Sequence, residues 1–364
     1  MLHRTALAAS LVAVLAVRGD TPAAHERIEL VGAMRVARAA HTVTLLTSGD
    51  VLIVGGMLDG GGAVRSFEIF DPRRNAIAGG GDMLEARAGH TATPLPDGRV
   101  LVAGGYNGAY LDAIELFDPR TGRFASAGRL REPRSGHTAT LLRDGTILFI
   151  GGVGTGWTFL SSAEVYDPRS GRSVVVAPLA AAREAHTATR LADGRVLVAG
   201  GHRGRRAAIV IYGSAEIYDP RSRRFSAAGD MTLPRHKHDA VPLRDGRVLI
   251  LGGADNRDAR GRYASTEVFD PATGRFAAGN PMNAPRFKFR DTTLVLGDGR
   301  VLVAGGARRA ELVTPGGAFR ALPGDFGSDL SFAASTVLAD GGALIAGGYD
   351  DSQRNSARIW RYSR

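Results

Sequence analysis

Short apolar runs, separated by glycine, aspartate and proline, recur along the chain after residue 25. In one copy they occupy residues 90–95, 99–103, 114–117 and a run that starts at residue 124. These runs are rich in β-branched and aromatic residues and have no helical periodicity, so they predict strands. An Asp-Gly turn joins the first run to the second, which favours antiparallel pairing. Each copy is therefore predicted to be a four-stranded antiparallel sheet.

The copies form an internal repeat marked by a Gly-Gly pair after the second run of each. Downstream of the pair most copies carry Glu, an apolar residue, an aromatic residue and Asp-Pro. A single small sheet cannot bury both of its faces, whereas sheets packed radially can. The pairs number seven and therefore predict seven packed sheets: Gly55-Gly56, Gly104-Gly105, Gly151-Gly152, Gly200-Gly201, Gly252-Gly253, Gly305-Gly306 and Gly347-Gly348.

The two ends of the chain complete one sheet in this interpretation. Residues 28–31 match the fourth run of a copy, and residues 357–360 match a third run with no fourth run after it. Pairing these ends closes the ring and leaves no unpaired edge. The sequence thus predicts an all-β fold over residues 25–364: a seven-bladed β-propeller of four-stranded antiparallel blades, with the last blade closed by the N-terminal strand.

Residues 1–24 have the features of a signal peptide. Arg4 precedes an apolar run from Ala6 to Val17, and small residues that suit cleavage follow. As a helix this run would extend only about 18 Å, too short for a hydrocarbon layer of about 30 Å. We expect an exported protein, periplasmic or extracellular, with no stable membrane insertion after cleavage. A retained N-terminal anchor is the alternative.

The repeat resembles the kelch family. The resemblance lies in the Gly-Gly after an apolar strand, in aromatic-Asp-Pro segments such as Tyr166-Asp167-Pro168, and in a spacing near 50 residues. Some copies depart from it: Val313-Thr314 stands where aromatic-Asp is expected, and Arg358 replaces a Glu. The resemblance implies a propeller like the central domain of galactose oxidase, without the copper-radical residues, since that chemistry needs a Cys and this chain has none. It also implies binding of proteins or sugars through loops.

Composition narrows the chemistry further. The absence of Cys excludes disulfides, thiolate metal sites and cysteine nucleophiles. The net charge is +10, but all except Lys237 and Lys288 of the 46 basic residues are arginine. This bias weakens the inference from charge to nucleic acid, and nucleic acid is not expected as a partner. We expect a monomer that needs no cofactor.

Three residue types recur at fixed repeat positions. The histidines could form a metal-binding ring, but one residue at one repeat position most simply makes the same hydrogen bond between blades, so no metal is expected. Arginines three positions earlier and third-strand glutamates predict ion pairs within the repeat. The residues are His41, His90, His137, His186 and His238; Arg38, Arg87, Arg134, Arg183 and Arg235; and Glu68, Glu115, Glu164, Glu216, Glu267 and Glu311.

Positions that break the repeat point to a binding site. The only two lysines occupy equivalent places in copies five and six, and arginines cluster in loops that share the same face. We expect this face of blades 4–6 to bind an anionic ligand, an acidic glycan or an acidic protein segment. The candidate residues are Arg203, Arg205, Arg206, Arg235, His236, Lys237, Arg257, Arg286, Lys288 and Arg290.

A carbohydrate-active enzyme is the alternative function. It would resemble the kelch-type sialic acid epimerases and would require a carboxylate and a base that converge at the mouth of the channel. Asp291 and His202 are candidates for these two groups. Because no paired-carboxylate spacing singles them out, a binding module without catalysis is the favoured interpretation.

Overall fold

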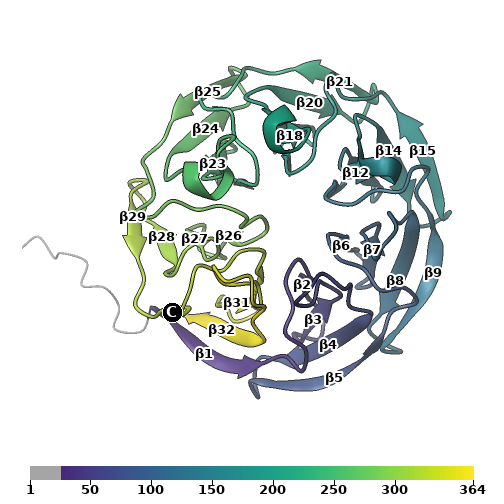
Figure 1. Ribbon diagram of the computed structural model, residues 1–364, viewed down its shortest axis with the longest axis vertical. Coiled ribbons are helices and arrows are strands. Elements are labelled where there is room, and N and C mark those ends of the chain that lie inside the picture. The colour runs from purple at the N-terminus through teal and green to yellow at the C-terminus, as the bar shows by residue number, and fades with distance from the viewer. Residues whose placement is uncertain (1–25) are drawn as a thin grey trace, which may run out of the picture.

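The structure is a computed structural model that describes residues 26–364. Seven four-stranded antiparallel sheets form a ring around a central channel (Figure 1). The predicted all-β fold, a propeller of seven four-stranded blades, is confirmed. The expected signal peptide at residues 1–24 lies outside the described residues and stays a prediction.

Blades 1 to 3 follow one another along the chain. Blade 3 also carries a short hairpin, β12 (Val153–Gly154) and β13 (Thr158–Phe159), joined by the 3-10 turn η1 (Thr155–Trp157). The blade strands are β2 (Thr42–Leu45), β3 (Val51–Val54), β4 (Ser66–Asp71) and β5 (Ala76–Asp82); β6 (Thr91–Pro94), β7 (Val100–Ala103), β8 (Ala113–Asp118) and β9 (Arg123–Arg129); β10 (Thr138–Leu141), β11 (Ile147–Ile150), β14 (Ala163–Asp167) and β15 (Arg172–Val176).

Blades 4 to 6 repeat this order. Blade 4 adds the hairpin β18 (His202–Arg203) and β19 (Val210–Ile211) around η2 (Arg206–Ala208), and blade 5 adds η3 (Asp258–Gly261). The blade strands are β16 (Thr187–Arg190), β17 (Val196–Ala199), β20 (Ala215–Asp219) and β21 (Arg224–Ala227); β22 (Asp239–Pro242), β23 (Val248–Leu251), β24 (Thr266–Asp270) and β25 (Arg275–Ala278); β26 (Thr293–Val295), β27 (Val301–Val303), β28 (Glu311–Val313) and β29 (Phe319–Ala321).

Blade 7 is built from both ends of the described chain. Its strand order is β1 (Arg27–Ala33), β32 (Arg358–Ser363), β31 (Ala343–Ala346) and β30 (Ala334–Val337). Strand β1 pairs antiparallel with β32, with Ile28 opposite Tyr362 and Leu30 opposite Trp360. The outermost strand of this blade therefore comes from the N-terminal side of the propeller and the other three from the C-terminal side (Figure 1).

The hydrophobic core lies between blades, not within them. The second strand of each blade is apolar on both faces because each face packs against a neighbouring blade, and Ile147 to Ile150 of β11 are all fully buried. One cluster joins Leu148 and Val165 of blade 3 to Val198 and Tyr218 of blade 4. Similar clusters join the other blades, so the ring is held by seven apolar interfaces. Each large side chain buried this way contributes about 1.5–3 kcal/mol.

The glycine pairs allow neighbouring blades to approach closely. Gly151 and Gly152 both have positive φ, at 60° and 93°. A Cβ on Gly151 would lie 2.6 Å from the carbonyl oxygen of Arg183, and one on Gly152 would lie 2.6 Å from that of Ser135. No side chain fits there. This segment therefore serves the close packing of neighbouring blades.

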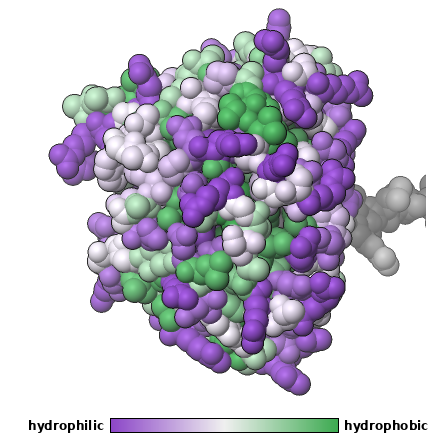
Figure 2. Space-filling model, turned by 90° about the vertical axis from the view of Figure 1, so that its right-hand side faces the viewer, coloured by the Kyte–Doolittle hydropathy of each residue, from purple (hydrophilic) through white to green (hydrophobic). Residues whose placement is uncertain are grey.

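One face of the ring carries the loops that matter for binding. Antiparallel order brings the loop before each first strand and the loop after each second strand to the same end of the blade, and the bridge between Ala88 and Tyr106 joins two such loops directly. We call this end the loop face. The side wall of the ring is mostly hydrophilic, with apolar residues in small scattered groups (Figure 2).

Candidate functional site

The repeated arginines and glutamates form buried ion pairs within the blades. The guanidinium of Arg134 is 3.0 Å from Glu164 and donates to the carbonyl of Gly151 at 2.8 Å. The other oxygen of Glu164 accepts the backbone N–H of Arg131 at 2.7 Å. The predicted ion pairs are therefore confirmed as scaffold. The six pairs are Arg38–Glu68, Arg87–Glu115, Arg134–Glu164, Arg183–Glu216, Arg235–Glu267 and Arg286–Glu311.

The repeated histidines connect neighbouring blades. Nε2 of His186 on blade 4 lies 3.0 Å from Oγ1 of Thr138 on blade 3, so the predicted hydrogen bond between blades is confirmed. His90, His137 and His238 make the same contact with the threonine of the preceding blade at 3.0–3.1 Å. Burial lowers the pKa of all of them, so the rings are neutral.

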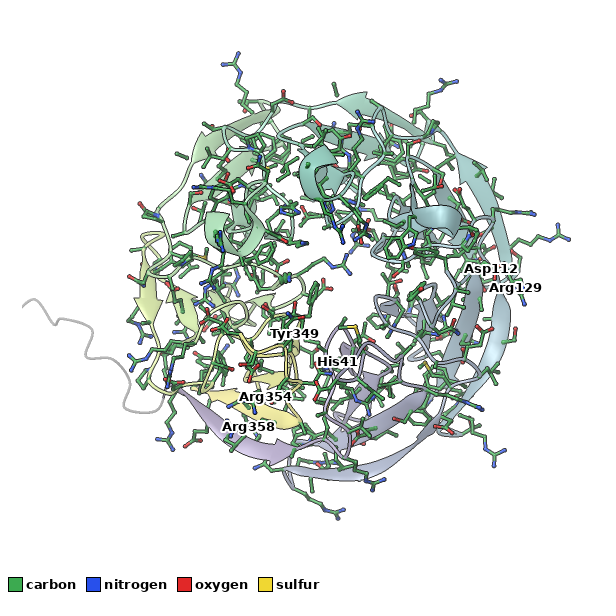
Figure 3. All side chains as sticks on the ribbon, in the orientation of Figure 1. His41, Asp112, Arg129, Tyr349, Arg354 and Arg358 are labelled. Carbon is green, nitrogen blue, oxygen red and sulfur yellow. The ribbon has the colours of Figure 1, made fainter. Side chains whose placement is uncertain are left out.

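His41 is the exception among these rings. Its preceding blade is blade 7, where Ala334 replaces the threonine, and neither ring nitrogen of His41 has a hydrogen-bond partner among the described residues. Burial lowers the pKa of His41 to about 3. The ring lies at the inner end of its blade (Figure 3).

A belt of backbone hydrogen bonds encircles the mouth of the channel. It is made by one residue per blade, the second after the repeated arginine, and each of these rim residues has φ between 50° and 65°. This left-handed conformation turns the N–H of each rim residue toward the carbonyl of the rim residue in the preceding blade. Six of the seven junctions have this bond, at 2.7–3.2 Å. The rim residues are Ala40, Gly89, Gly136, Ala185, Lys237, Lys288 and Phe332.

The rim residues have small side chains on one side of the mouth and large side chains on the other. Blades 1–4 have a glycine or an alanine there, and of these only the glycines, Gly89 and Gly136, adopt the left-handed backbone without strain. Blades 5–7 instead have Lys237, Lys288 and Phe332, for which this conformation is unfavourable. The belt explains the backbone geometry in all seven blades, but it does not explain the choice of two lysines and a phenylalanine. Those side chains line a cavity of about 360 Å³ at the mouth, which we call the mouth cavity.

Aromatic side chains from blades 2 and 3 form one wall of the mouth cavity. The ring of Tyr110 is 5.0 Å from that of Tyr106 and 5.9 Å from that of Trp157. Trp157, on η1, is 57% exposed. The guanidinium of Arg205 from blade 4 stacks over the Trp157 ring at 4.4 Å. This wall combines a large apolar surface with one cation.

Lysines from blades 5 and 6 form the opposite wall. Nζ of Lys288 donates to the hydroxyl of Tyr349 at 2.8 Å, and lies 5.2–5.7 Å from the ring centres of Phe287, Phe332 and Tyr349. Nζ of Lys237 contacts Oδ1 of Asp258 at 3.0 Å. Burial lowers the pKa of both lysines and raises that of Tyr349 to about 12.

An insertion in blade 6 divides the channel. In six blades the leucine that follows the first strand lies eight positions after the repeated arginine, or after Leu330 in blade 7, whereas in blade 6 it lies ten positions after Arg286. The extra residues, Arg290 and Asp291, lie at the boundary between the mouth cavity and an inner cavity of about 270 Å³. Nη1 of Arg290 donates to the carbonyl of His137 on blade 3 at 3.1 Å. The guanidinium thus spans the channel.

Asp239 of blade 5 holds this inserted turn. Its Oδ2 accepts the backbone N–H groups of Thr292 and Thr293 at 3.2 and 2.9 Å. Asp239 stands where other blades have the threonine that bonds a histidine, and in blade 6 that histidine is Phe289. Burial, with the nearby charge of Asp291, raises the pKa of Asp239 to about 7.

The candidate residues lie in different surroundings. Arg205, Lys237, Lys288 and Arg290 line the mouth cavity. Arg235 and Arg286 are fully buried in their ion pairs. The remaining four divide as follows: His236 is buried with Nδ1 3.2 Å from Nδ1 of His202, Arg257 pairs with Asp255 at 2.6 Å, and Arg203 and Arg206 are exposed on the hairpin of blade 4.

The two residues considered for catalysis line different cavities. Asp291 lines the channel cavities, with its carboxylate exposed and 3.3 Å from Nε of Arg290. His202 lines a separate hollow beside Arg205 and Asp258, and burial lowers its pKa to about 3. The structure therefore does not bring this acid and this base together.

Sequence reasoning missed the aromatic wall and the inserted turn. Tyr106, Tyr110 and Trp157 lie in loops after second strands, where the repeat pattern assigns no role. The ten-residue spacing in blade 6 was a readable signal for Arg290 and Asp291. Asp239 could have been noticed as the one acidic residue at a position that is threonine in five blades.

Two further observations concern residues 26–364 as a whole. No three His, Asp or Glu side chains in this range lie close enough together to hold a metal ion. The same range contains no helix with the length and apolarity needed to cross a membrane.

Comparison with known proteins agrees with the architecture. Residues 87–130, which run from the repeated arginine of blade 2 through its fourth strand, match the model of the kelch motif. No curated protein matches the chain. The protein is thus a seven-bladed β-propeller whose second blade matches the kelch motif.

Proposed function

We propose that this kelch propeller is an exported interaction module that binds an anionic ligand at the mouth of its channel. Kelch propellers commonly mediate protein interactions, and this coarser role follows from the architecture. The finer proposal rests on one observation: four cationic side chains, Arg205, Lys237, Lys288 and Arg290, converge on the mouth cavity. Export rests on the sequence of residues 1–24.

Charge and shape both support this location. The cavity carries four cations against three carboxylates, those of Glu184 and Asp291 in its wall and that of Asp258 beside Lys237, so it keeps a net positive potential. Its volume of about 360 Å³ lies in the range of ligand pockets, about 300–1,000 Å³. The scaffold arginines contribute nothing to binding in this proposal, because their charges are neutralised by buried glutamates.

The proposal is tested by reversing the charge of the rim. The double variant Lys237→Glu, Lys288→Glu is compared with the parent for binding to an acidic peptide and to arrays of anionic glycans. Arg123→Glu is the matched control, because this exposed arginine lies at the opposite end of blade 2. We expect the double variant to lose binding and the control to keep it. Unchanged binding by the double variant would refute the proposal.

A separate measurement tests export. Sequencing the N-terminus of the protein recovered from the periplasm or the medium should show a chain that begins near residue 25. A full-length chain retained in the cytoplasm would contradict this part of the proposal.

A further inference from the structure

We infer that the ligand of the mouth cavity is a single carboxylate carried by an apolar group, as at the C-terminus of a polypeptide that ends in an apolar residue. This inference rests on the proposed function and specifies the chemistry of the ligand. It favours a chain terminus over an acidic glycan or an internal acidic segment.

The charges in the cavity favour one negative charge. Three of the four cations already have a carboxylate within 4 Å: Arg205 has Glu184 at 3.5 Å, Lys237 has Asp258 at 3.0 Å and Arg290 has Asp291 at 3.3 Å. Among residues 26–364, Lys288 has no carboxylate within that distance. One uncompensated cation matches a monoanionic carboxylate, whereas a dianionic phosphate would leave a charge unpaired in a partly buried site.

Lys288 is fixed in place before any ligand arrives. Its backbone is part of the belt, with its N–H bonded to the carbonyl of Lys237 and its own carbonyl bonded to the N–H of Phe332. Its ammonium group has three N–H donors, of which one bonds to Tyr349. The other two remain for a ligand, and the surrounding rings restrict the side chain, so little rotamer freedom is lost on binding.

The wall opposite Lys288 suits an apolar group better than a sugar. It consists of Tyr106, Tyr110 and Trp157, and the floor beside it is formed by small apolar residues of the rim and its neighbours. The hydroxyl of Ser135 on this side is already directed at the carbonyl of Gly89, at 3.4 Å. A sugar ring would bring several hydroxyl groups against a surface with few partners for them, which disfavours its binding.

The inserted turn favours entry by the end of a chain. Because Arg290 spans the channel to the carbonyl of His137, it separates the mouth cavity from the inner cavity. A ligand enters from the loop face and stops at this guanidinium. A terminal residue can occupy a cavity with one opening. A segment that continues at both ends would have to enter and leave through the same opening.

The decisive probes are a matched pair that differ in one charge. N-acetylphenylalanine has an aromatic ring and one carboxylate, and its amide has the same ring without the charge. The chain has only two tryptophans, and since Trp360 is buried, a ligand on the aromatic wall should change the fluorescence of Trp157. We expect the acid to change this fluorescence in a saturable way and the amide to bind at least tenfold more weakly.

Variants of the protein test which residue binds the carboxylate of the ligand and which residue binds its ring. Lys288→Gln should weaken the acid at least tenfold and bring it close to the amide, whereas the control Arg123→Gln should leave both unchanged. Trp157→Ala removes the fluorescent reporter, so its effect is measured by calorimetry, where we expect weaker binding of the acid. Unfolding curves of each variant show whether the fold is intact, and Lys288→Arg, which keeps the charge, should retain part of the affinity.

Further probes separate the sources of the carboxylate. A ten-residue peptide ending in phenylalanine should bind with a free C-terminus and lose at least tenfold when amidated. Tighter binding of glucuronate than of N-acetylphenylalanine would overturn the inference in favour of an acidic sugar. An amidated peptide with an internal run of glutamate gives a further outcome. If this peptide binds through Lys237 and Lys288 while N-acetylphenylalanine and glucuronate do not bind, the proposed function stands and this inference fails. If no anionic probe binds, both fail.

Discussion

Nη1 of Arg290 donates a hydrogen bond of 3.1 Å to the carbonyl oxygen of His137, across the channel and 153 residues away in the sequence. The contact exists because blade 6 has two residues more than its siblings before its first strand ends. Through it, a local change of length in one repeat divides the central channel into two cavities.

Arg290→Ala should join the two cavities with little loss of stability. The inserted turn remains held by Asp239 and by the hydroxyl of Ser335, which donates to the carbonyl of Asp291 at 3.0 Å. We expect the free energy of unfolding in urea to fall by about 1 kcal/mol, as for one ordinary hydrogen bond. A loss above about 3 kcal/mol would show that the contact is part of the scaffold.

His186→Phe and His41→Phe should have opposite effects. The first removes the partner of the buried Thr138 hydroxyl and should cost about 1–3 kcal/mol. The second removes two buried ring nitrogens without partners, and blade 6 shows with Phe289 that the position accepts this residue, so we expect no loss or a gain of up to about 1 kcal/mol. Thermal unfolding of both variants checks this. Equal destabilisation would contradict the proposed role of the threonine.

Arg134→Leu should be among the most damaging single substitutions. It leaves Glu164 as an unpaired buried charge, which costs about 3–5 kcal/mol. Blade 7 has both positions changed: Leu330 is buried in place of the arginine, and the strand register places the buried Trp360, not Arg358 as the sequence spacing indicated, at the position of the glutamate. Accordingly, adding Glu164→Gln to the leucine variant should recover part of the loss. A double-mutant cycle in urea measures this, and strictly additive losses would argue against direct coupling.

Asp239 should make the protein less stable as the pH rises from about 4 to about 7. Its pKa is raised from 3.8 to about 7 in the folded state, so between these values the folded protein binds more protons than the unfolded chain. The contribution of this group therefore falls through that window and stays low above it. The difference in unfolding free energy between Asp239→Asn and the parent should grow toward alkaline pH. If that difference is the same at pH 5 and pH 8, Asp239 does not titrate in this range.

The repeat made most of the scaffold predictable. The residues at 90–95, 99–103, 114–117 and from 124 onward correspond closely to β6–β9, because Asp-Gly turns and glycine pairs fix where each strand stops. The roles of Arg134, Glu164 and His186 followed from the same logic, since a residue that recurs at one repeat position performs one scaffold task. Because the chain contains seven copies, the copies could be compared with one another to find the positions that recur.

The mouth of the channel was predictable only in part. The two lysines stood out because they were the only ones, and both line the mouth cavity. Arg235 and Arg286 were also expected to bind the ligand, but their side chains point into the blades and pair with glutamate. The repeat position of Arg235 already indicated this ion pair, whereas Arg286 was not recognised as its equivalent because Phe289 stands where the repeated histidine is expected.

The sequence by itself determined the number of blades, the position of the strands and the residues that repeat, because turn chemistry and short apolar runs are local features that recur in the seven copies. The tertiary structure decided which non-repeated side chains meet. Trp157, Arg205, Lys288 and Arg290 come from three blades and share one cavity only because the ring closes and brings loops distant in the chain to a common axis. Proximity across a ring depends on packing between blades, and no single repeat encodes it.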